Sequence, residues 1–285
     1  MTVQTTTPSG VKSHEEPAKR QRRHPQVPRM RRSIRNEPLV FGIIGFILVL
    51  VVWELAVNVG LARAALMSSP TRIFNAAVTD FGSGAIWPHI LTSLLEWTVG
   101  FALAIVVGIP LGLILGTFRR VGMIVDPLLS ALYATPTVAL VPLIILLFGI
   151  GIQAKFFIVF LEALVTITVS TISGARSADA RHLQTAQSFG ASRWLVFTSV
   201  TLPSSVPFIV TGLRIGAGRA LVGVIVAEFI AANVGIGFYI SLNGNLLNAS
   251  RVMLGVLLIG VFGVFVGVVI GRIQRYFDRW RPAIR

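Results

Sequence analysis

The chain contains six apolar stretches that are each long enough to cross a lipid bilayer as a helix. A helix needs about 20 residues to span roughly 30 Å of hydrocarbon. The stretches cover residues 39–57, 89–117, 126–148, 155–175, 206–232 and 252–270. Of the 285 residues, 54% are hydrophobic and only 13% are charged, which leaves too little polar surface for a soluble domain of this size. The sequence therefore predicts an all-α, polytopic membrane protein with six transmembrane helices.

Positive charges are distributed unevenly between these stretches. With the N-terminus inside, nineteen of the 25 Lys and Arg residues lie on the cytoplasmic side, four (among them Lys155) lie outside, and two lie within a span. Cytoplasmic segments of membrane proteins carry such an excess of Lys and Arg. We therefore expect a multi-pass protein of the inner (cytoplasmic) membrane with both termini in the cytoplasm.

Composition divides the chain into three parts. Residues 1–38 are rich in Pro, Thr and charge and hold nine of the Lys and Arg residues, which predicts a disordered basic cytoplasmic tail. Residues 39–272 form the transmembrane domain, and residues 273–285 form a cytoplasmic C-terminal tail. The net charge of +14 is concentrated beside the membrane, where each Lys or Arg is attracted to anionic lipid by about 1 kcal/mol. Contact with the lipid membrane, and not with nucleic acid, explains it.

Catalytic and metal-binding signals are missing from the sequence. There is no cysteine, and the four histidines lie far apart without metal-ligand spacing. A phosphate-binding loop of the form G-x-x-x-x-G-K-[ST] does not occur. We predict no catalytic residues, no metal site and no cofactor on this chain.

One polar segment, residues 177–203, interrupts the apolar pattern between the fourth and fifth stretches. Ser177 is predicted to cap a short helix that runs to Phe189, and Gly190 to end it in a left-handed conformation. Ser192 is predicted to cap a second short helix, which Leu202-Pro203 would end before the fifth span. The topology places this helix–glycine–helix segment in the cytoplasm.

Within this segment the residues resemble the cytoplasmic signature of inner-membrane permease subunits of bacterial binding-protein-dependent ABC importers. That signature reads E-A-A, three residues, Gly, nine residues, then I-x-L-P. Here the chain has Gln184-Thr185-Ala186, three residues, Gly190, nine residues, then Val200-Thr201-Leu202-Pro203. The similarity extends over about residues 67–272, where segments such as GLRIGAGRALVGVIVAEF resemble the nitrate/sulfonate/taurine-type branch.

The resemblance implies a MetI-like permease fold and transport without chemistry on this chain. The residues that would dock the ATPase, as a coupling helix does in that family, are Gln184, Thr185, Ala186, Gly190, Leu202 and Pro203. The implied partners are two ABC ATPase subunits, which carry ATP-Mg, a second copy of the permease in a homodimer, and an extracytoplasmic solute-binding protein. The solute would be a small anion, and nitrate, sulfonates, taurine, aromatic acids and vitamin precursors all fit the branch.

Four charged residues in the apolar stretches are candidates for the translocation path: Arg219, Glu162, Glu228 and Glu96. Charged groups at membrane depth usually face a bundle interior or a water-filled cavity. They either line the path or form structural pairs, such as Glu162 or Glu96 with Arg219. The alternative function, an ion-gradient-driven secondary transporter, would use the same acids and need no ATPase.

Glycines and prolines predict how the spans pack and bend. Glycines four residues apart allow two helices to approach closely, and the sequence has three such sets: Gly108, Gly112 and Gly116; Gly212 and Gly216; Gly263, Gly267 and Gly271. Pro136 and Pro142 predict kinks in the third span because each removes a backbone donor.

Overall fold

The computed structural model describes residues 37–60 and 68–278, and nearly all of them are helical. Contacts divide the chain after Ile47 into two units, and the larger unit, from Leu48 onward, carries every feature discussed below. Most of the predicted N-terminal tail, and the last seven residues, fall outside the described residues.

The helices follow one another with short connections. Their bounds are α1 Glu37–Asn58, α2 Pro70–Gly82, α3 Trp87–Thr117, α4 Arg119–Ala134, α5 Thr137–Phe148, α6 Ile152–Arg176, α7 Ala180–Ser188, α8 Arg193–Val196, a π-helical turn η1 Phe197–Thr201, α9 Leu202–Ala231, α10 Ile236–Asn245 and α11 Ala249–Asp278.

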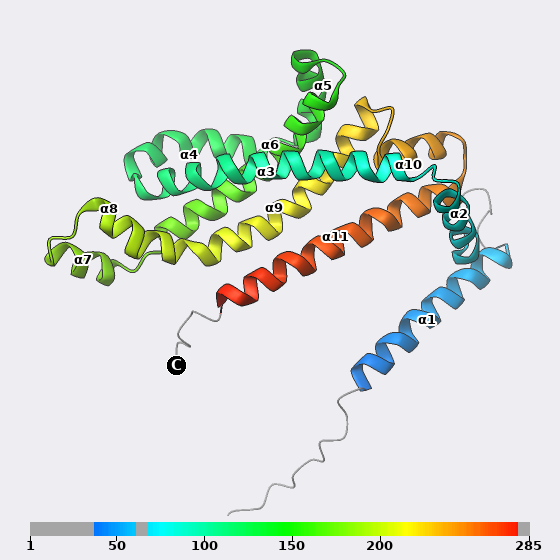
Figure 1. The fold of residues 1–285 in the computed structure, drawn as a ribbon, viewed down its shortest axis with the longest axis horizontal. Coiled ribbons are helices and arrows are strands. Elements are labelled where there is room, and N and C mark those ends of the chain that lie inside the picture. Colours follow the sequence, from blue (N-terminus) through cyan, green and yellow to red (C-terminus); the bar gives the residue numbers. More distant parts are fainter. Residues whose placement is uncertain (1–36, 61–67, 279–285) are drawn as a thin grey trace, which may run out of the picture. The chain divides into compact units, whose positions relative to one another are not determined.

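Helix α6 is the centre of the larger unit, because α3 and α9 pack along it on either side (Figure 1). The glycine sets on α3 and α9 face α6. A Cβ atom at Gly112 would lie 2.5 Å from Thr171 Cβ, and one at Gly216 would lie 2.9 Å from Ile167 Cγ1. The predicted close approach is therefore confirmed for these two sets, and both are directed at the same helix.

The third glycine set, on α11, differs from this prediction. Within the part of the chain that the structure describes, no heavy atom lies within 4 Å of a Cβ built at Gly267 or Gly271, whereas Gly263 meets Leu221 of α9 at 3.3 Å. The spacing is the same as on α3, but only Gly263 of this set lies against a neighbouring helix among the described residues.

The third predicted span is broken rather than kinked. Helices α4 and α5 meet at Thr135-Pro136 at an angle of 100°. Pro136 precedes the first residue of α5 and has extended backbone dihedrals, whereas Pro142 lies inside α5. Five helices are long and apolar enough to cross a membrane, or six if the bent pair counts as one span.

Two predicted ends of the polar segment are wrong. Ser177 follows the end of α6, where its Oγ donates to the Gly174 carbonyl, and Asp179 accepts from the Arg181 N–H at the start of α7. Pro203 does not end a helix, because the π-helical turn carries the chain from α8 straight into α9. In that turn the Leu202 N–H donates to Phe197, five residues back, so the helix continues before the proline.

Candidate functional site

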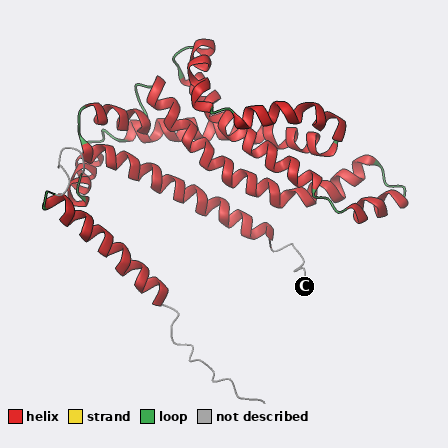
Figure 2. Ribbon diagram, turned by 180° about the vertical axis from the view of Figure 1, so that it is seen from behind, coloured by secondary structure: helices red, strands yellow, loops and turns green. Residues whose placement is uncertain are grey.

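The polar segment connects α6 to α9 and lies at one end of the larger unit. Figures 1 and 2 show α7 and α8 projecting beyond the ends of α3 and α11, while α2 and α10 lie at the opposite end. Gly190 joins α7 to α8 with a φ of +70°, and Ser192 caps α8 by accepting from the Leu195 N–H at 3.3 Å. Both of these predictions from the sequence are confirmed.

We call residues 177–203 the docking segment, after the role that the resemblance in sequence leads us to expect. Two aromatic side chains on it are exposed: Phe189 to 87% and Trp194 to 72% of their surface. Trp194 stacks on Phe197 at a ring-centroid distance of 5.6 Å. Aromatic side chains are enriched in protein interfaces, so Phe189 and Trp194 are the candidates for contact with a partner.

The structure also places the six predicted docking residues. Gln184, Thr185, Gly190 and Pro203 are exposed, and Ala186 and Leu202 are half-buried. The first three residues lie on α7, one turn or more from Gly190, and Leu202-Pro203 lies at the start of α9. Residues 189–192 separate α7 from α8, and from α8 onward the π-helical turn continues into α9 as one helical arm.

Charged residues in the membrane part fall into two groups. Arg219 is exposed on α9 and Glu162 is half-buried on α6, and neither forms an ion pair among the described residues. Glu96 and Glu228 are buried, with 0% and 1% of their surface exposed. The suggested pairing of Arg219 with Glu96 is wrong, because Glu96 binds a different cation.

That cation is Lys155, whose position the sequence had placed outside the membrane. Lys155 lies in the first turn of α6 with 8% of its surface exposed, and its Nζ donates to Glu96 Oε1 at 2.7 Å. Burial of Lys155 is sustained by this pair, since an ammonium group is costly to bury alone. We refer to Ser93, Glu96, Lys155 and Glu228 as the buried polar cluster.

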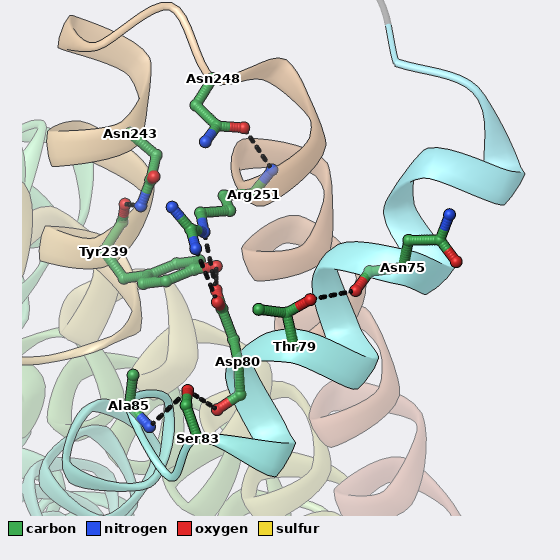
Figure 3. A network of polar contacts seen from close by, with 9 residues as sticks. All are labelled: Asn75, Thr79, Asp80, Ser83, Ala85, Tyr239, Asn243, Asn248 and Arg251. Carbon is green, nitrogen blue, oxygen red and sulfur yellow. Dashed lines mark hydrogen bonds and ion pairs between the residues drawn. The ribbon is translucent and has the colours of Figure 1, made fainter.

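A second polar group lies at the opposite end from the docking segment, and Figure 3 shows it. Arg251 of α11 donates to both carboxylate oxygens of Asp80 of α2, at 3.0 and 2.9 Å, and the Tyr239 hydroxyl of α10 donates to Asp80 Oδ2 at 2.5 Å. Asn248 accepts from the Arg251 N–H at 3.4 Å. One buried aspartate thus fastens three helices together.

The surroundings of Asp80 set its protonation state. Burial raises the pKa of its carboxyl group, but the hydrogen bonds from Arg251 and Tyr239 and the charge of Arg251 outweigh burial and lower the pKa below its ordinary value. Burial, together with the hydrogen bond to Asp80, raises the pKa of the Tyr239 hydroxyl. Asp80 is therefore ionised and Tyr239 neutral over the ordinary pH range. Sequence inspection missed this group because its members are 159 and 171 residues apart along the chain.

An apolar cavity of about 260 Å³ lies between α3, α9, α10 and α11. Its lining is aliphatic and aromatic, including Leu94, Leu221 and Phe262, with Ser93 as its polar residue. A small anion needs convergent donors or positive charge. This cavity is consequently not a site for an anionic solute.

Comparisons with known proteins agree with these features. The family described as "Binding-protein-dependent transport system inner membrane component" matches residues 108–281. The taurine transport system permease protein TauC of Escherichia coli (strain K12) is 29% identical over 241 residues, which cover 83% of this chain and 88% of TauC. The putative aliphatic sulfonates transport permease protein SsuC of the same strain is 35% identical over 236 residues, which cover 82% of this chain and 89% of SsuC.

A solved structure shares the fold. A chain of the MetNI methionine ABC transporter, in an inward-facing conformation, aligns with a TM-score of 0.60 over 68% of this chain and 98% of the MetNI chain, at 18% identity. At this identity the match speaks for the fold alone, and it confirms the MetI-like prediction.

The family assignment rests on independent observations. The helix–Gly190–helix arm, the five or six apolar helices and the matched sequence relatives agree with one another. The chain thus belongs to the binding-protein-dependent transport system inner membrane components and is a permease of an ABC importer, in the branch whose relatives include taurine and sulfonate permeases.

Proposed function

We propose that this permease imports a small organic anion of the sulfonate class and is driven by separate ATPase subunits that bind the docking segment. The observation that carries the proposal is the exposed helical arm that leads from Gly190 through α8 directly into α9. Force applied to α8 reaches α9, which packs along α6, without passing through a flexible loop.

The proposed complex contains two copies of this chain, two ATPase subunits that hold ATP-Mg, and an extracytoplasmic solute-binding protein. The docking segment and both termini face the cytoplasm in this arrangement. The excess of Lys and Arg on that side supports it. Closure of the ATPase dimer would move the two arms and switch the access of the path, so the ATPase and the solute each favour one state.

Docking is tested by co-purifying the ATPase with the tagged permease. We expect Phe189→Ala and Trp194→Ala to reduce the retained ATPase, because buried aromatic anchors carry much of the energy of protein interfaces. Phe74→Ala is the matched control, since Phe74 is also an exposed phenylalanine, at 67%, but lies on α2 at the opposite end. Equal ATPase retention by all three variants would contradict docking through this segment.

The solute class follows from charge and from the relatives. TauC and SsuC are named for taurine and aliphatic sulfonates. Arg219 and Arg214 are exposed cations on α9, a membrane-spanning helix, and neither has an ion partner among the described residues. An unpaired arginine in such a helix is expected to face a water-filled path. We assign Arg219 to the path, with Glu162 of α6 as a second, half-buried candidate.

Uptake of labelled taurine and of an alkanesulfonate by the reconstituted complex tests this assignment. We expect Arg219→Gln to reduce uptake and Arg219→Lys to retain part of it, while the amount of assembled complex stays unchanged. Competition with nitrate separates the sulfonate class from other anions. Unchanged uptake in Arg219→Gln would remove this residue from the path, and a failure of both sulfonates to be transported would reject the solute class but not the docking proposal.

A further inference from the structure

The charges of the buried polar cluster do not balance if every group is ionised. Two carboxyl groups, on Glu96 and Glu228, face one ammonium group, on Lys155, and these side chains are 0%, 1% and 8% exposed. Full ionisation would leave one net negative charge buried within membrane-spanning helices. A buried group without a partner of opposite charge is neutralised in preference to remaining ionised.

Glu228 is held firmly as a hydrogen-bond acceptor. Its Oε1 accepts from the Ser93 hydroxyl at 2.6 Å, and its Oε2 accepts from the Gly237 N–H at 2.6 Å. The Ile236 N–H donates to Ser93 Oγ at 2.8 Å, so the Ser93 proton is directed at Glu228. The carboxyl group therefore closes the turn between α9 and α10 and cannot swing away to reduce repulsion.

Only one of the two carboxyl oxygens of Glu96 has a hydrogen-bond partner among the described residues. Its Oε1 accepts from Lys155 Nζ at 2.7 Å, whereas its Oε2 is buried and has no hydrogen-bond partner among the described residues. Ser93, which binds Glu228, lies three residues before Glu96 on α3, so the two carboxyl groups are neighbours on one face of that helix. Two ionised carboxylates in such a site repel, and a proton shared between them removes the repulsion.

We propose that Glu96 and Glu228 share one bound proton at neutral pH, which is a resident ligand of the buried polar cluster. The proton supplies the hydrogen bond that Glu96 Oε2 lacks. It also makes the cluster neutral, with one carboxylate, one ammonium group and one carboxylic acid. The cluster then joins α3, α6 and the α9–α10 turn, and this inference is independent of the solute and of ATPase docking.

Other titratable groups near the cluster come from each neighbouring helix. On α3, His89 Nδ1 lies 3.1 Å from the Gly235 nitrogen and 3.0 Å from its carbonyl oxygen, next to the turn that Glu228 closes. On α10, Tyr239 donates to Asp80. On α6, Glu162 is half-buried, and its Cγ would lie 3.2 Å from a Cβ atom built at Gly223 of α9. Arg219 is exposed on α9. His89 and Glu162 therefore provide the controls.

Infrared spectroscopy of the purified permease in lipid nanodiscs tests the proposal. We expect the wild type at pH 7 to show the C=O stretch of a protonated carboxyl group, shifted in D₂O. Glu228→Gln removes the need for the shared proton, because Lys155 and Glu96 then balance, and should lose the band. Glu162→Gln, which removes a carboxyl group outside the cluster, should keep it.

Stability as a function of pH provides the second measurement. The folded wild type holds a proton that the unfolded chain has released at neutral pH, so stability falls as the pH rises, with a limit of about tenfold in the unfolding equilibrium per pH unit for one proton. Glu228→Gln should lack this component, whereas His89→Gln should retain it. The double variant Glu96→Gln, Glu228→Gln leaves Lys155 without a carboxylate and should be the least stable.

The wild-type measurements decide the case even if a variant fails to fold. A protonated-carboxyl band at pH 7 that disappears at higher pH, together with the loss of stability, supports the shared proton. Absence of the band in the wild type at pH 7, or a band that Glu228→Gln leaves unchanged, overturns it.

Discussion

A side chain at Gly112 of α3 should destabilise the protein. The Cβ atom of an alanine there would lie 2.5 Å from Thr171 Cβ and 2.8 Å from the Thr168 carbonyl oxygen, both on α6. Carbon atoms in ordinary contact are about 3.5–4.0 Å apart, so α3 and α6 must separate locally by about 1 Å. A Cβ atom and a backbone oxygen cannot rotate out of the way.

The expected loss follows from two opposing contributions. Over-packing costs about 1–3 kcal/mol, and this clash with fixed atoms belongs at the upper end. Alanine returns about 1 kcal/mol over glycine in a helix interior. The net loss in the free energy of unfolding is then about 2 kcal/mol, or roughly 4–8 °C in melting temperature for a domain of this size.

Thermal unfolding of the purified permease in one detergent provides the assay. Gly267→Ala on α11 is the matched control, because no heavy atom of the described residues lies within 4 Å of its added Cβ. We expect Gly267→Ala to melt at or above the wild-type temperature and Gly112→Ala below it. If the two variants melt alike, close approach of α3 and α6 at Gly112 is not what stabilises this pair of helices.

Three further predictions concern positions away from α3. Because the pKa of Asp80 is lowered in the folded chain, the stability from its pair with Arg251 is present above the ordinary aspartate range and is lost as the pH falls through the lowered value. Asp80→Asn should therefore lower the free energy of unfolding by about 1.5–3 kcal/mol at pH 7, and its stability should change less than that of the wild type when the pH is lowered. Gly190→Ala should cost about 1 kcal/mol through its φ of +70° alone, since its added Cβ meets nothing within 4 Å, and hydrogen exchange should rise in α7. Gly235→Ala should lower the free energy of unfolding by more, about 3 kcal/mol or above, because φ is +134° and the added Cβ collides with the Glu228 carboxyl group. A melting temperature equal to that of Gly190→Ala would contradict this ranking.

Local chemistry in the sequence predicted the docking segment in part. The φ > 0 at Gly190 and the cap at Ser192 depend on residues within four positions of each other, and both are confirmed. The helix end expected at Pro203 is wrong, because a π-helical turn of five residues precedes the proline and the helix continues through it although Pro203 has no N–H donor. A rule for single residues does not contain that adjustment.

Charged pairs were the least predictable feature. Glu96 and Lys155 are 59 residues apart, and Lys155 at the edge of an apolar stretch has the pattern of an exposed loop residue. Only when α3 packs on α6 does the ammonium group meet a buried carboxylate, and Arg219 then remains exposed without a partner among the described residues.

The sequence by itself determined the class of molecule and the family, because the length of an apolar run and the spacing of Gly190 before Leu202-Pro203 are properties of consecutive residues. Tertiary structure alone decided which glycine sets are used: Gly112 meets α6, while Gly267, with the same four-residue spacing on α11, meets nothing within 4 Å among the described residues. It likewise decided that Glu96 pairs with Lys155 and that Asp80 joins three helices. Spacing along one helix defines a face, but what that face contacts depends on how the helix is turned toward its neighbours.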